Sequence, residues 1–289
     1  MSNGSFQRLS WRDISPFGVE VDYDLRQPMT PEEQAAFKEL FFKESLLVFH
    51  RQTLSEDEQV RVTGYLGPIT PPEAELRRME AVGAQGVVEF SFHSDYSFGA
   101  EPIIGISLHA LDVVEGESYT RFASGIRAYR ALPAELKAKA DSHRIHSSMM
   151  AGRIEPGDEI PQHWPQVIRD VVMPHPVTGA PILYVIEQHA VRILDIEVGE
   201  SEKLMREFAA YLFAEDSIYR HEWVNGDFVV WDNLALQHAR PELSTVTRRV
   251  LQRATVATKT FFELFPDFHF DANFSLEDKK VGRWAKAPT

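Results

Sequence analysis

Residues 219–233 read YRHEWVNGDFVVWDN, and this stretch says more about the fold than any other part of the chain. The pair Asn225-Gly226 stands between two runs rich in β-branched and aromatic residues, 219–224 and 228–231. An Asn-Gly pair between such runs is a strong hairpin signal, because both residues tolerate positive φ. The sequence therefore predicts two antiparallel strands paired across this turn, in a C-terminal third built mainly of strands.

The segments on both sides of this stretch predict further strands and two early helices. Strand-like runs occur at 46–49, 87–92, 103–108 and 250–256. Thr30 and Glu33 form a capping box that begins one helix. Ser55 and Glu58 begin a second helix, which should end at Gly67.

Three more segments complete the expected outline of a single domain over residues 1–289. Apolar residues at helical spacing predict an amphipathic helix at 200–213. Residues 71–86 have no clear period and begin with two prolines, so we expect a loop there, with 70–90 as a lid. The aromatic tail, within 261–289, should cover an edge of the core. Strands dominate, which indicates a β-sandwich or open barrel with helices packed outside.

Composition excludes several classes of partner and cofactor. The net charge is −13 and no basic run exceeds two residues, which argues against nucleic acid and anionic membranes as partners. The chain has no cysteine, so disulfides, thiolate metal sites, iron–sulfur clusters and cysteine nucleophiles are excluded. We see no signal peptide and no apolar run of membrane-spanning length, and we expect a cytoplasmic protein. Phosphate-binding glycine loops and the Gly-x-Ser-x-Gly elbow are also absent.

Three residues could hold a metal ion. His93 and Asp95 are two positions apart, so on an extended segment both side chains point to the same face. With His238 they would supply two imidazoles and one carboxylate, the facial triad of non-haem Fe(II) oxygenases, which leaves positions open for a co-substrate and O₂. Short motifs such as His-x-Asp occur by chance, and only tertiary structure could bring His238 to this pair.

A late strand carries two arginines on one face. Arg249, Leu251 and Arg253 alternate with aliphatic residues such as Val250 and Ala254. One interpretation is that this polar face meets solvent. The other is that both arginines point into a barrel, where a guanidinium can hold a carboxylate bidentately and keep its charge when buried.

Other histidines and acids have simpler interpretations. His143 and His146 are three apart and would share a helical face, but two polar residues on a loop or strand are the better reading. His189 is a candidate pocket residue. Asp227, next to the predicted turn, is expected to be a turn residue.

Several motifs together resemble the family of taurine dioxygenase and 2,4-dichlorophenoxyacetate dioxygenase, whose members are Fe(II)/2-oxoglutarate-dependent oxygenases. The motifs that carry the resemblance are 92–98 (FHSDYSF), 123–132 (ASGIRAYRAL), His175-Pro176 with Thr178-Gly179, 226–233 (GDFVVWDN), His238 and 248–253. The resemblance covers about residues 10 to 258. It implies a double-stranded β-helix, or jelly-roll, core of the cupin-like type, mainly β with flanking helices.

The same resemblance implies roles for individual residues. His93, Asp95 and His238 would bind Fe(II) and form the catalytic centre. Arg249 would pair with the distal carboxylate of 2-oxoglutarate, and Thr120 occupies the position of a threonine that hydrogen-bonds the same carboxylate.

Further family positions concern the surroundings of the site. Arg253 matches a second arginine that faces the active site and contacts either the substrate acid or the co-substrate, while Trp231 and Asn233 would be structural neighbours. The residues before Thr120, 117–119, are Glu-Ser-Tyr where the family usually has Gly-Gly-Asp. Residues 51–92 contain no histidine to match the sulfonate-binding histidine of taurine dioxygenase, so we do not expect taurine to be the substrate.

We therefore expect a dioxygenase that uses Fe(II), 2-oxoglutarate and O₂ to hydroxylate a small organic acid or amino-acid-like molecule, or to cleave it through a hydroxylated product. Succinate and CO₂ would be released. The presence of Asp95 favours hydroxylation over halogenation, because related halogenases lack this carboxylate. Two alternatives stay open: a Zn²⁺- or Mn²⁺-dependent isomerase or hydrolase on a similar fold without O₂ chemistry, and a non-catalytic binding protein. A homo-oligomer, dimer or tetramer, is also expected.

Overall fold

Two sheets form the centre of the computed structural model, which describes residues 3–69, 77–82, 89–101, 103–155, 157–243 and 245–269. The larger sheet has eight strands in the order β1 (Asn3–Phe6), β2 (Leu9–Asp13), β3 (Val19–Asp22), β4 (Leu46–Phe49), β15 (Phe228–Asp232), β7 (Gly105–Val113), β17 (Arg248–Val256) and β5 (Arg77–Val82). The smaller sheet has four strands in the order β14 (Ile218–Glu222), β8 (Tyr119–Ser124), β16 (Leu236–Arg240) and β6 (Phe90–His93). The chain passes from one sheet to the other between β6 and β7, between β7 and β8, and at each step from β14 to β17. This alternation confirms the expected jelly-roll core.

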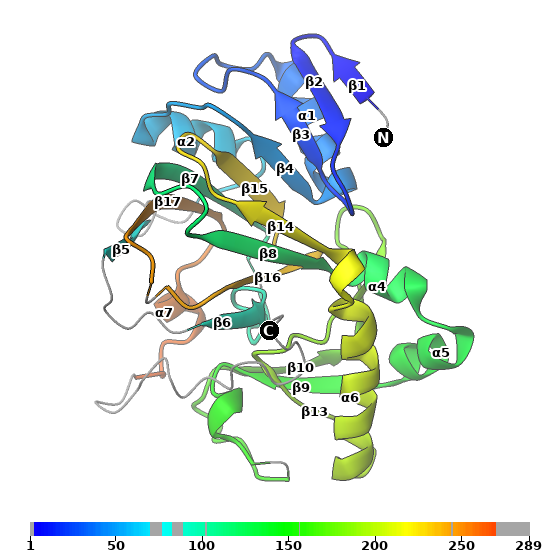
Figure 1. The fold of residues 1–289 in the computed structure, drawn as a ribbon. Coiled ribbons are helices and arrows are strands. Elements are labelled where there is room, and N and C mark those ends of the chain that lie inside the picture. The colour runs from blue at the N-terminus through cyan, green and yellow to red at the C-terminus, as the bar shows by residue number, and fades with distance from the viewer. Residues whose placement is uncertain are drawn as a thin grey trace.

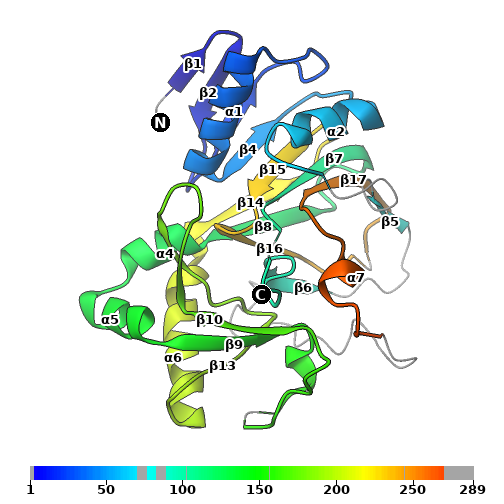
Figure 2. The same ribbon diagram turned by 180° about the vertical axis from the view of Figure 1, so that it is seen from behind.

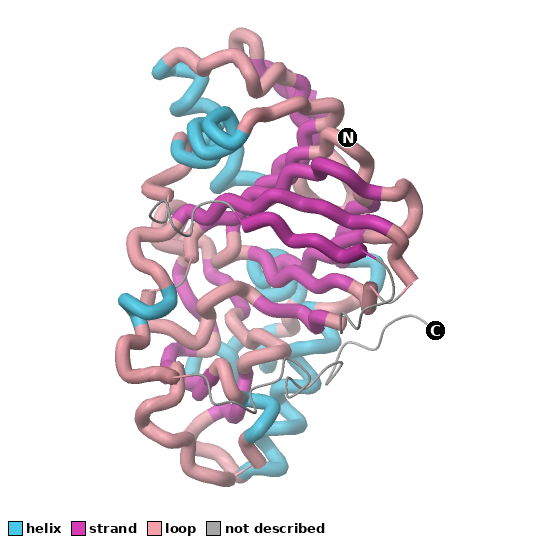
Figure 3. The backbone as a smooth tube through the Cα atoms, turned by 90° about the vertical axis from the view of Figure 1, so that its left-hand side faces the viewer, coloured by secondary structure: helices cyan, strands magenta, loops and turns pink. Residues whose placement is uncertain are grey.

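Helices and two minor sheets surround this core. The helices are α1 (Pro31–Glu44), α2 (Glu56–Gly64), α4 (Gly125–Ala131), α5 (Ala134–Ser142), α6 (Val198–Leu212) and α7 (Phe261–Leu264), with 3₁₀ turns at Ala151–Arg153 and Glu215–Ser217. The minor sheets are β10 (Gln166–Asp170), β9 (Arg144–Ser148) and β13 (Ala190–Ile193), and the pair β11 (Val172–Pro174) and β12 (Pro181–Leu183). Figure 1 shows β1–β3 with α1 and α2 at one end of the molecule and β9, β10 and β13 with α6 at the other. The helices lie outside the strands in the side view of Figure 3.

The predicted turn exists, but the predicted hairpin is wrong. The amide of Asp227 donates to the carbonyl of Val224 at 3.0 Å, and Gly226 has φ +82. A Cβ at Gly226 would lie 2.8 Å from the carbonyl oxygen of Gln52, so both conformation and space require glycine here. However, β14 pairs with β8, whereas β15 pairs with β4 and β7. The turn joins the two sheets because both strands bury an apolar face in the space between the sheets.

The other early elements agree with expectation, apart from two differences. Both capping boxes are present, at Thr30 and at Ser55, but the second helix ends at Gly64 rather than at Gly67. The segment 71–86, expected to be a loop, contains strand β5, which pairs antiparallel with β17. The backbone at the edge of β17 has unpaired N–H and C=O groups, and residues 77–82 pair with them although their sequence has no strand pattern. The rest of the predicted lid (70–76 and 83–88) and the tail after residue 269 lie outside the described residues.

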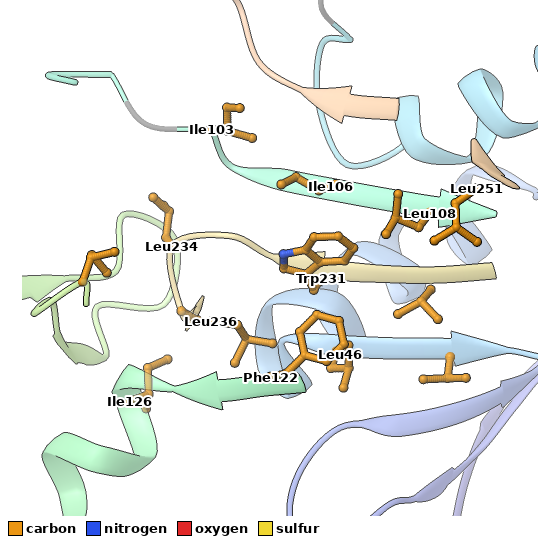
Figure 4. Close-up of a cluster of buried hydrophobic side chains, with 14 of the residues drawn as sticks. Leu46, Ile103, Ile106, Leu108, Phe122, Ile126, Trp231, Leu234, Leu236 and Leu251 are labelled. Atoms are coloured by element: carbon orange, nitrogen blue, oxygen red, sulfur yellow. The ribbon is translucent and has the colours of Figure 1, made fainter. Parts of the chain in front are cut away.

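The main hydrophobic core lies between the two sheets. Trp231 of β15 packs edge-on against Phe122 of β8, with ring centroids 5.3 Å apart, and Leu251 of β17 lies in the same cluster. Figure 4 shows Trp231 extending from the larger sheet toward Phe122, with Leu46 and Ile106 beside them. Each fully buried side chain of this size stabilises the fold by about 1.5–3 kcal/mol. A second core, which contains Phe37 and Phe41 of α1, packs on the outer face of the larger sheet.

A buried polar network ties α2 to β17. The side-chain amide of Gln59 donates to the hydroxyl of Ser107 at 3.2 Å and to the backbone carbonyl of Gln252 at 3.0 Å. The Gln252 side chain donates back to Gln59 at 3.1 Å, and Thr63 lies 2.8 Å from Ser107. The network holds β17 from its outer face, so that the next residue, Arg253, points to the inner face.

Two histidines bind one carboxylate near the turn. The pKa of Asp227 is about 2, because its bonds to His221 and His50 outweigh the burial that would raise it. His50 Nδ1 lies 2.6 Å from this carboxylate, and His221 Nε2 lies 3.1 Å from it. Asp227 is therefore more than the turn residue that the sequence indicates: it joins β14, β15 and the segment after β4.

Among the described residues, no helix is long and apolar enough to cross a membrane.

Removal of the buried amide in Gln59→Ala should destabilise the protein by about 2 kcal/mol, because its partners lose bonds where water cannot replace them. The urea midpoint of unfolding, followed by circular dichroism, should fall with an unchanged m value. Gln162→Ala, at an exposed position, is the matched control and should change stability by less than about 0.5 kcal/mol. Equal midpoints for the two variants would show that the network does not stabilise β17.

The pKa of His50 is raised, mainly by its hydrogen bond to Asp227, although burial opposes the shift. Because the folded pKa lies above the ordinary value, the contribution of His50 to stability is fully present below about pH 6.5 and is lost as pH rises through the folded pKa. The difference in unfolding free energy between wild type and His50→Gln should therefore shrink above neutral pH. A difference that stays constant from pH 5.5 to 9 would contradict this, and His163→Gln, on an exposed residue, serves as the control.

Candidate metal centre

Strand pairing brings the two distant histidines together. In the antiparallel register of β6 and β16, His93 lies directly opposite His238, and their ring centroids are 4.1 Å apart. Asp95 follows in the turn after β6, with a carboxylate oxygen 3.4 Å from His93 Nε2. One candidate ligand atom from each of the three residues lies within 4.8 Å of the others, and no further group of this kind occurs among the described residues. The structure therefore brings together all three predicted residues.

Neighbouring groups orient both imidazoles. The Nδ1 of His93 lies 2.9 Å from the carbonyl of Ser91, so a proton on Nδ1 would donate there and leave Nε2 free toward Asp95. The ring of His238 packs against Trp231, with centroids 4.9 Å apart, and stacks on Phe122 at 6.5 Å. Burial, and after it the neighbouring His93, holds the pKa of His238 well below its ordinary value. The His238 ring is thus neutral, which is the form that binds metals.

The backbone around Asp95 is clamped by one asparagine. The Asp95 amide donates to Asn233 Oδ1 at 3.0 Å, and Asn233 Nδ2 donates to the carbonyls of Asp95 and Ile103, each at 3.0 Å. Tyr96 then adopts φ +57, a conformation unfavourable for a large side chain. Strained backbone of this kind concentrates at functional sites, where the surrounding structure enforces it.

The Asp95 carboxylate forms an ion pair with Arg253 of β17. Burial alone would raise the pKa of Asp95, but the charge of Arg253, together with His93 and His238, holds it well below the ordinary value. Asp95 is therefore ionised at neutral pH. The structure thus gives Arg253 a partner, Asp95, that the resemblance did not indicate. The resemblance had left open whether Arg253 contacts the substrate or the co-substrate.

The donor set fits a divalent transition metal. Two imidazoles and one carboxylate on one face suit Fe(II) and leave the opposite coordination positions open. Bonds of about 2.1 Å to such a metal need only small side-chain adjustments from ligand atoms that already lie within 4.8 Å of one another.

The arginine face of β17 points into the sandwich, so the solvent-facing interpretation is wrong. Arg249 is only 4% exposed, and its neighbour in register on β7 is Val113 of the main core. The Nε of Arg249 has no hydrogen-bond partner among the described residues. Burial, with the charge of Arg240 as a second cause, lowers the pKa of Arg249 to about 9, which still leaves it charged at neutral pH.

Thr120 also lies in the interior. It is 3% exposed, and its hydroxyl oxygen accepts a hydrogen bond from the indole N–H of Trp223 at 3.0 Å. The hydroxyl proton of Thr120 remains able to donate to an anion.

The other histidines considered in the sequence lie where the sequence indicates. His143 lies after the end of α5 and contacts the carbonyl of Lys139 at 2.7 Å, whereas His146 lies on β9 and contacts Gln166 at 2.8 Å. They do not form a metal pair. His189, the candidate pocket residue, lies beside the centre, with its ring edge-on to His93 at 6.4 Å.

Sequence reasoning missed a buried pair that supports the centre. His175 Nε2 lies 2.7 Å from Asp232 Oδ2, and neither side chain is exposed to solvent. The other Asp232 oxygen accepts the amides of Leu234 and Ala235, so the turn that carries Asn233 is held from both sides. His175 is part of a quoted motif, but only the fold reveals its partner. Arg240 was also missed, although its position two residues after His238 on a strand could have indicated a shared face.

Comparison with known proteins agrees with this geometry. A family model described as taurine catabolism dioxygenase TauD, TfdA family matches residues 10–255. The alpha-ketoglutarate-dependent 2,4-dichlorophenoxyacetate dioxygenase of Cupriavidus pinatubonensis is 29% identical over 268 residues, which cover 82% of this chain and 93% of the relative. The (S)-phenoxypropionate/alpha-ketoglutarate-dioxygenase of Sphingobium herbicidovorans is 26% identical, over 74% of this chain and 82% of that protein.

Solved structures are similar over most of their length. The crystal structure of AAD-2 in complex with Mn(II) and N-oxalylglycine is 29% identical, with a TM-score of 0.74 over 87% of this chain and 98% of that chain. A taurine dioxygenase from Burkholderia xenovorans has a TM-score of 0.76 at 21% identity, over 87% and 92% of the two chains, a likeness that concerns the fold.

Loss of the clamp in Asn233→Ala should weaken binding of Fe(II) or Mn(II) by about 10- to 100-fold, as is typical when a group that orients a ligand is removed. Anaerobic titration calorimetry measures this affinity. Asn225→Ala is a matched control, because Asn225 bonds the amide and carbonyl of Val113 in the same way, away from the centre. If both variants bind metal as the wild type does, Asn233 does not position Asp95.

Proposed function

From the premise that this chain belongs to the taurine catabolism dioxygenase TauD, TfdA family, we propose which residues carry its reaction and what substrate they accept. As a member, the protein is an Fe(II)- and 2-oxoglutarate-dependent dioxygenase, an oxidoreductase that acts on a small organic substrate. The alternatives without O₂ chemistry have no observation in their favour.

His93, Asp95 and His238 hold the iron in this proposal, and Arg249 with Thr120 holds the distal carboxylate of 2-oxoglutarate. The observation that carries the assignment is the convergence of the triad in a sandwich that also contains the buried Arg249, whose Nε has no hydrogen-bond partner among the described residues. Bound Fe(II) supplies open positions for 2-oxoglutarate and O₂ and couples the oxidative decarboxylation of 2-oxoglutarate, to succinate and CO₂, with hydroxylation of the substrate.

The chain itself supplies orientation and a dry interior. Arg253 keeps Asp95 ionised and in place, so we assign it first to the carboxylate ligand and only then to a substrate acid. Trp231 and Phe122 fix the ring of His238 and exclude water from its buried side.

A group of aromatic side chains beside the triad supports the proposal of a substrate with a flat apolar body. The ring of Phe98 lies edge-on to His189 at 4.9 Å and packs on Phe265 of the tail at 5.6 Å. Tyr96, next to Asp95, packs on Phe261 of α7 at 5.7 Å. Seen from behind in Figure 2, α7 lies beside β6.

Two of the relatives named above act, by their names, on phenoxyalkanoic acids. We therefore propose a small organic acid with an aromatic or similarly flat body as the substrate, and hydroxylation as the outcome.

The wider organisation of the protein is also a proposal. A single domain over 1–289 is supported by one family model that spans residues 10–255. The tail at 261–289 as a cover of the site is supported at its start by the packing of Phe261 on Tyr96 and of Phe265 on Phe98. The lid at 70–90 stays a prediction, because its described part is strand β5 and the rest lies outside the described residues. A cytoplasmic location rests on the cysteine-free composition. The absence of a nucleic-acid partner rests on the charge of −13, and a dimer or tetramer is to be tested by light scattering.

Under anaerobic conditions, protein with Fe(II) and 2-oxoglutarate should show a metal-to-ligand absorption band. Asp95→Ala should abolish it, because the site loses a ligand. Arg249→Gln should weaken 2-oxoglutarate binding by about 10- to 100-fold, the range expected for loss of hydrogen bonds to a charged group.

Arg248→Gln is the control, since Arg248 is the adjacent residue, is half-exposed and pairs with Asp112 instead. Succinate release over a library of aryloxy and aliphatic acids then identifies the substrate class. An unchanged titration in Arg249→Gln, or a band that survives in Asp95→Ala, would refute the assignment.

A further inference from the structure

We infer that Trp223 is a positioning residue for the co-substrate, because its indole N–H fixes the direction in which the Thr120 hydroxyl donates. The hydroxyl proton then points to the distal carboxylate of 2-oxoglutarate. The inference rests on the proposed function, in which Thr120 binds that carboxylate, and it adds a residue to which the resemblance gives no role. It depends on one buried hydrogen bond, on the direction of that bond and on the strand pairing that holds both side chains.

Strand pairing places Trp223 beside Thr120 on the inner face of the smaller sheet. Thr120 of β8 lies opposite His221 of β14 in the antiparallel register, and Trp223 follows His221 by two residues. The amide of Trp223 donates to the carbonyl of Ser118 at 3.2 Å, which continues the pairing by one residue beyond the end of β14. The Trp223 side chain belongs to the main core between the sheets, so the two partners meet in the interior.

Packing holds both partners of the bond. Trp223 is completely buried, and its ring packs edge-on to that of His221, with centroids 4.6 Å apart. His221 is itself anchored, since its Nε2 lies 3.1 Å from the carboxylate of Asp227. Thr120 is buried and β-branched, which restricts its side-chain rotamers. The geometry of the bond is therefore set before any ligand binds.

The bond between Trp223 and Thr120 has only one possible direction. An indole nitrogen is a donor and never an acceptor, so Trp223 Nε1 donates to Thr120 Oγ1, at 3.0 Å, and cannot receive the hydroxyl proton in return. The proton of the Thr120 hydroxyl must point elsewhere, and no acceptor for it occurs in the part of the chain that the structure describes. Hydrogen bonds in a chain polarise one another, so a hydroxyl that accepts from an indole is also a stronger donor.

The distal carboxylate of 2-oxoglutarate is the matching acceptor. Carboxylate oxygens only accept, and a hydrogen bond to an ionised group is about twice as strong as one between neutral groups. The proposed function puts this carboxylate at Thr120 and the buried Arg249. The neighbour of Arg249 in register on β7, Val113, belongs to the same core cluster as Trp223. Trp223 therefore acts on the far end of the keto acid and not on the end that faces the metal.

Anaerobic titration of the Fe(II) protein with two keto acids tests this inference. 2-Oxoglutarate and 2-oxovalerate have the same length, but the first ends in a carboxylate and the second in a methyl group. Trp223→Phe keeps a buried ring and removes the N–H. The titration midpoint for 2-oxoglutarate should rise by about 3- to 10-fold, the range expected for one neutral hydrogen bond. The midpoint for 2-oxovalerate should not change.

A double-mutant cycle with Thr120→Val separates this effect from a loss of packing. Thr120→Val removes the hydroxyl and keeps the shape, and it should raise the 2-oxoglutarate midpoint by about 10- to 100-fold, because a bond to a charged group is lost. Once the hydroxyl is absent, Trp223→Phe should cause no further rise, since the indole acts through Thr120. Trp223→Met, whose flexible side chain fills irregular space, is the second variant without a donor and replaces Trp223→Phe if the latter does not fold.

The matched control is Trp11→Phe, because Trp11 packs on the second core, outside the sandwich, and this variant should titrate as the wild type does. An unchanged 2-oxoglutarate midpoint in Trp223→Phe overturns the inference. An equal loss for both keto acids, or a further loss in the Thr120→Val background, also overturns it, since either result indicates a purely structural role. An unchanged midpoint in Thr120→Val refutes the proposed role of Thr120 instead, and a wild type without any band refutes the proposed function itself.

Discussion

The antiparallel pairing of β6 with β16 is the constraint on which the rest of the site depends. It puts His93 directly opposite His238, although about half of the chain lies between them. The pairing holds because the smaller sheet packs through Phe122 on Trp231 of the larger sheet. Trp231 also packs against the ring of His238, so this side chain belongs both to the hydrophobic core and to the surroundings of the metal centre.

The interior of the sandwich contains two arginines, although the chain as a whole is negatively charged. The net charge is −13, yet Arg249 and Arg253 both point from β17 into the interior. Arg253 is matched by Asp95, the carboxylate that would bind the metal. The buried Nε of Arg249 has no hydrogen-bond partner in the part of the chain that the structure describes, and burial together with the charge of Arg240 lowers the pKa of Arg249 to about 9. In the proposed function, an anionic co-substrate supplies the negative charge that Arg249 lacks, which would explain why a jelly-roll core tolerates this buried arginine.

Polar contacts outside the triad give the metal ligands a defined geometry. Asn233 binds the backbone of Asp95 on both its amide and its carbonyl, and the turn that carries Asn233 is held by the buried pair of His175 and Asp232. The network around Gln59 fixes β17 from the opposite face of the larger sheet. These contacts connect the minor strands and α2 to the centre, so the surrounding elements contribute to function without touching a ligand.

Local patterns in the sequence determined the features that depend on neighbouring residues alone. The capping boxes at Thr30 and Ser55 and the turn at Asn225-Gly226 follow from such short-range chemistry, and the motifs around His93 and His238 identified the family and the candidate triad. Only the tertiary structure decided which strands pair, because strand partners depend on burial between sheets. The strands on either side of the turn therefore joined different sheets, and β5 formed where no strand pattern exists. The tertiary structure also decided how three arginines are placed, since each depends on contacts between residues far apart in the chain. Arg249 points into the interior, Arg253 pairs with Asp95, and Arg240 lies beside Phe90.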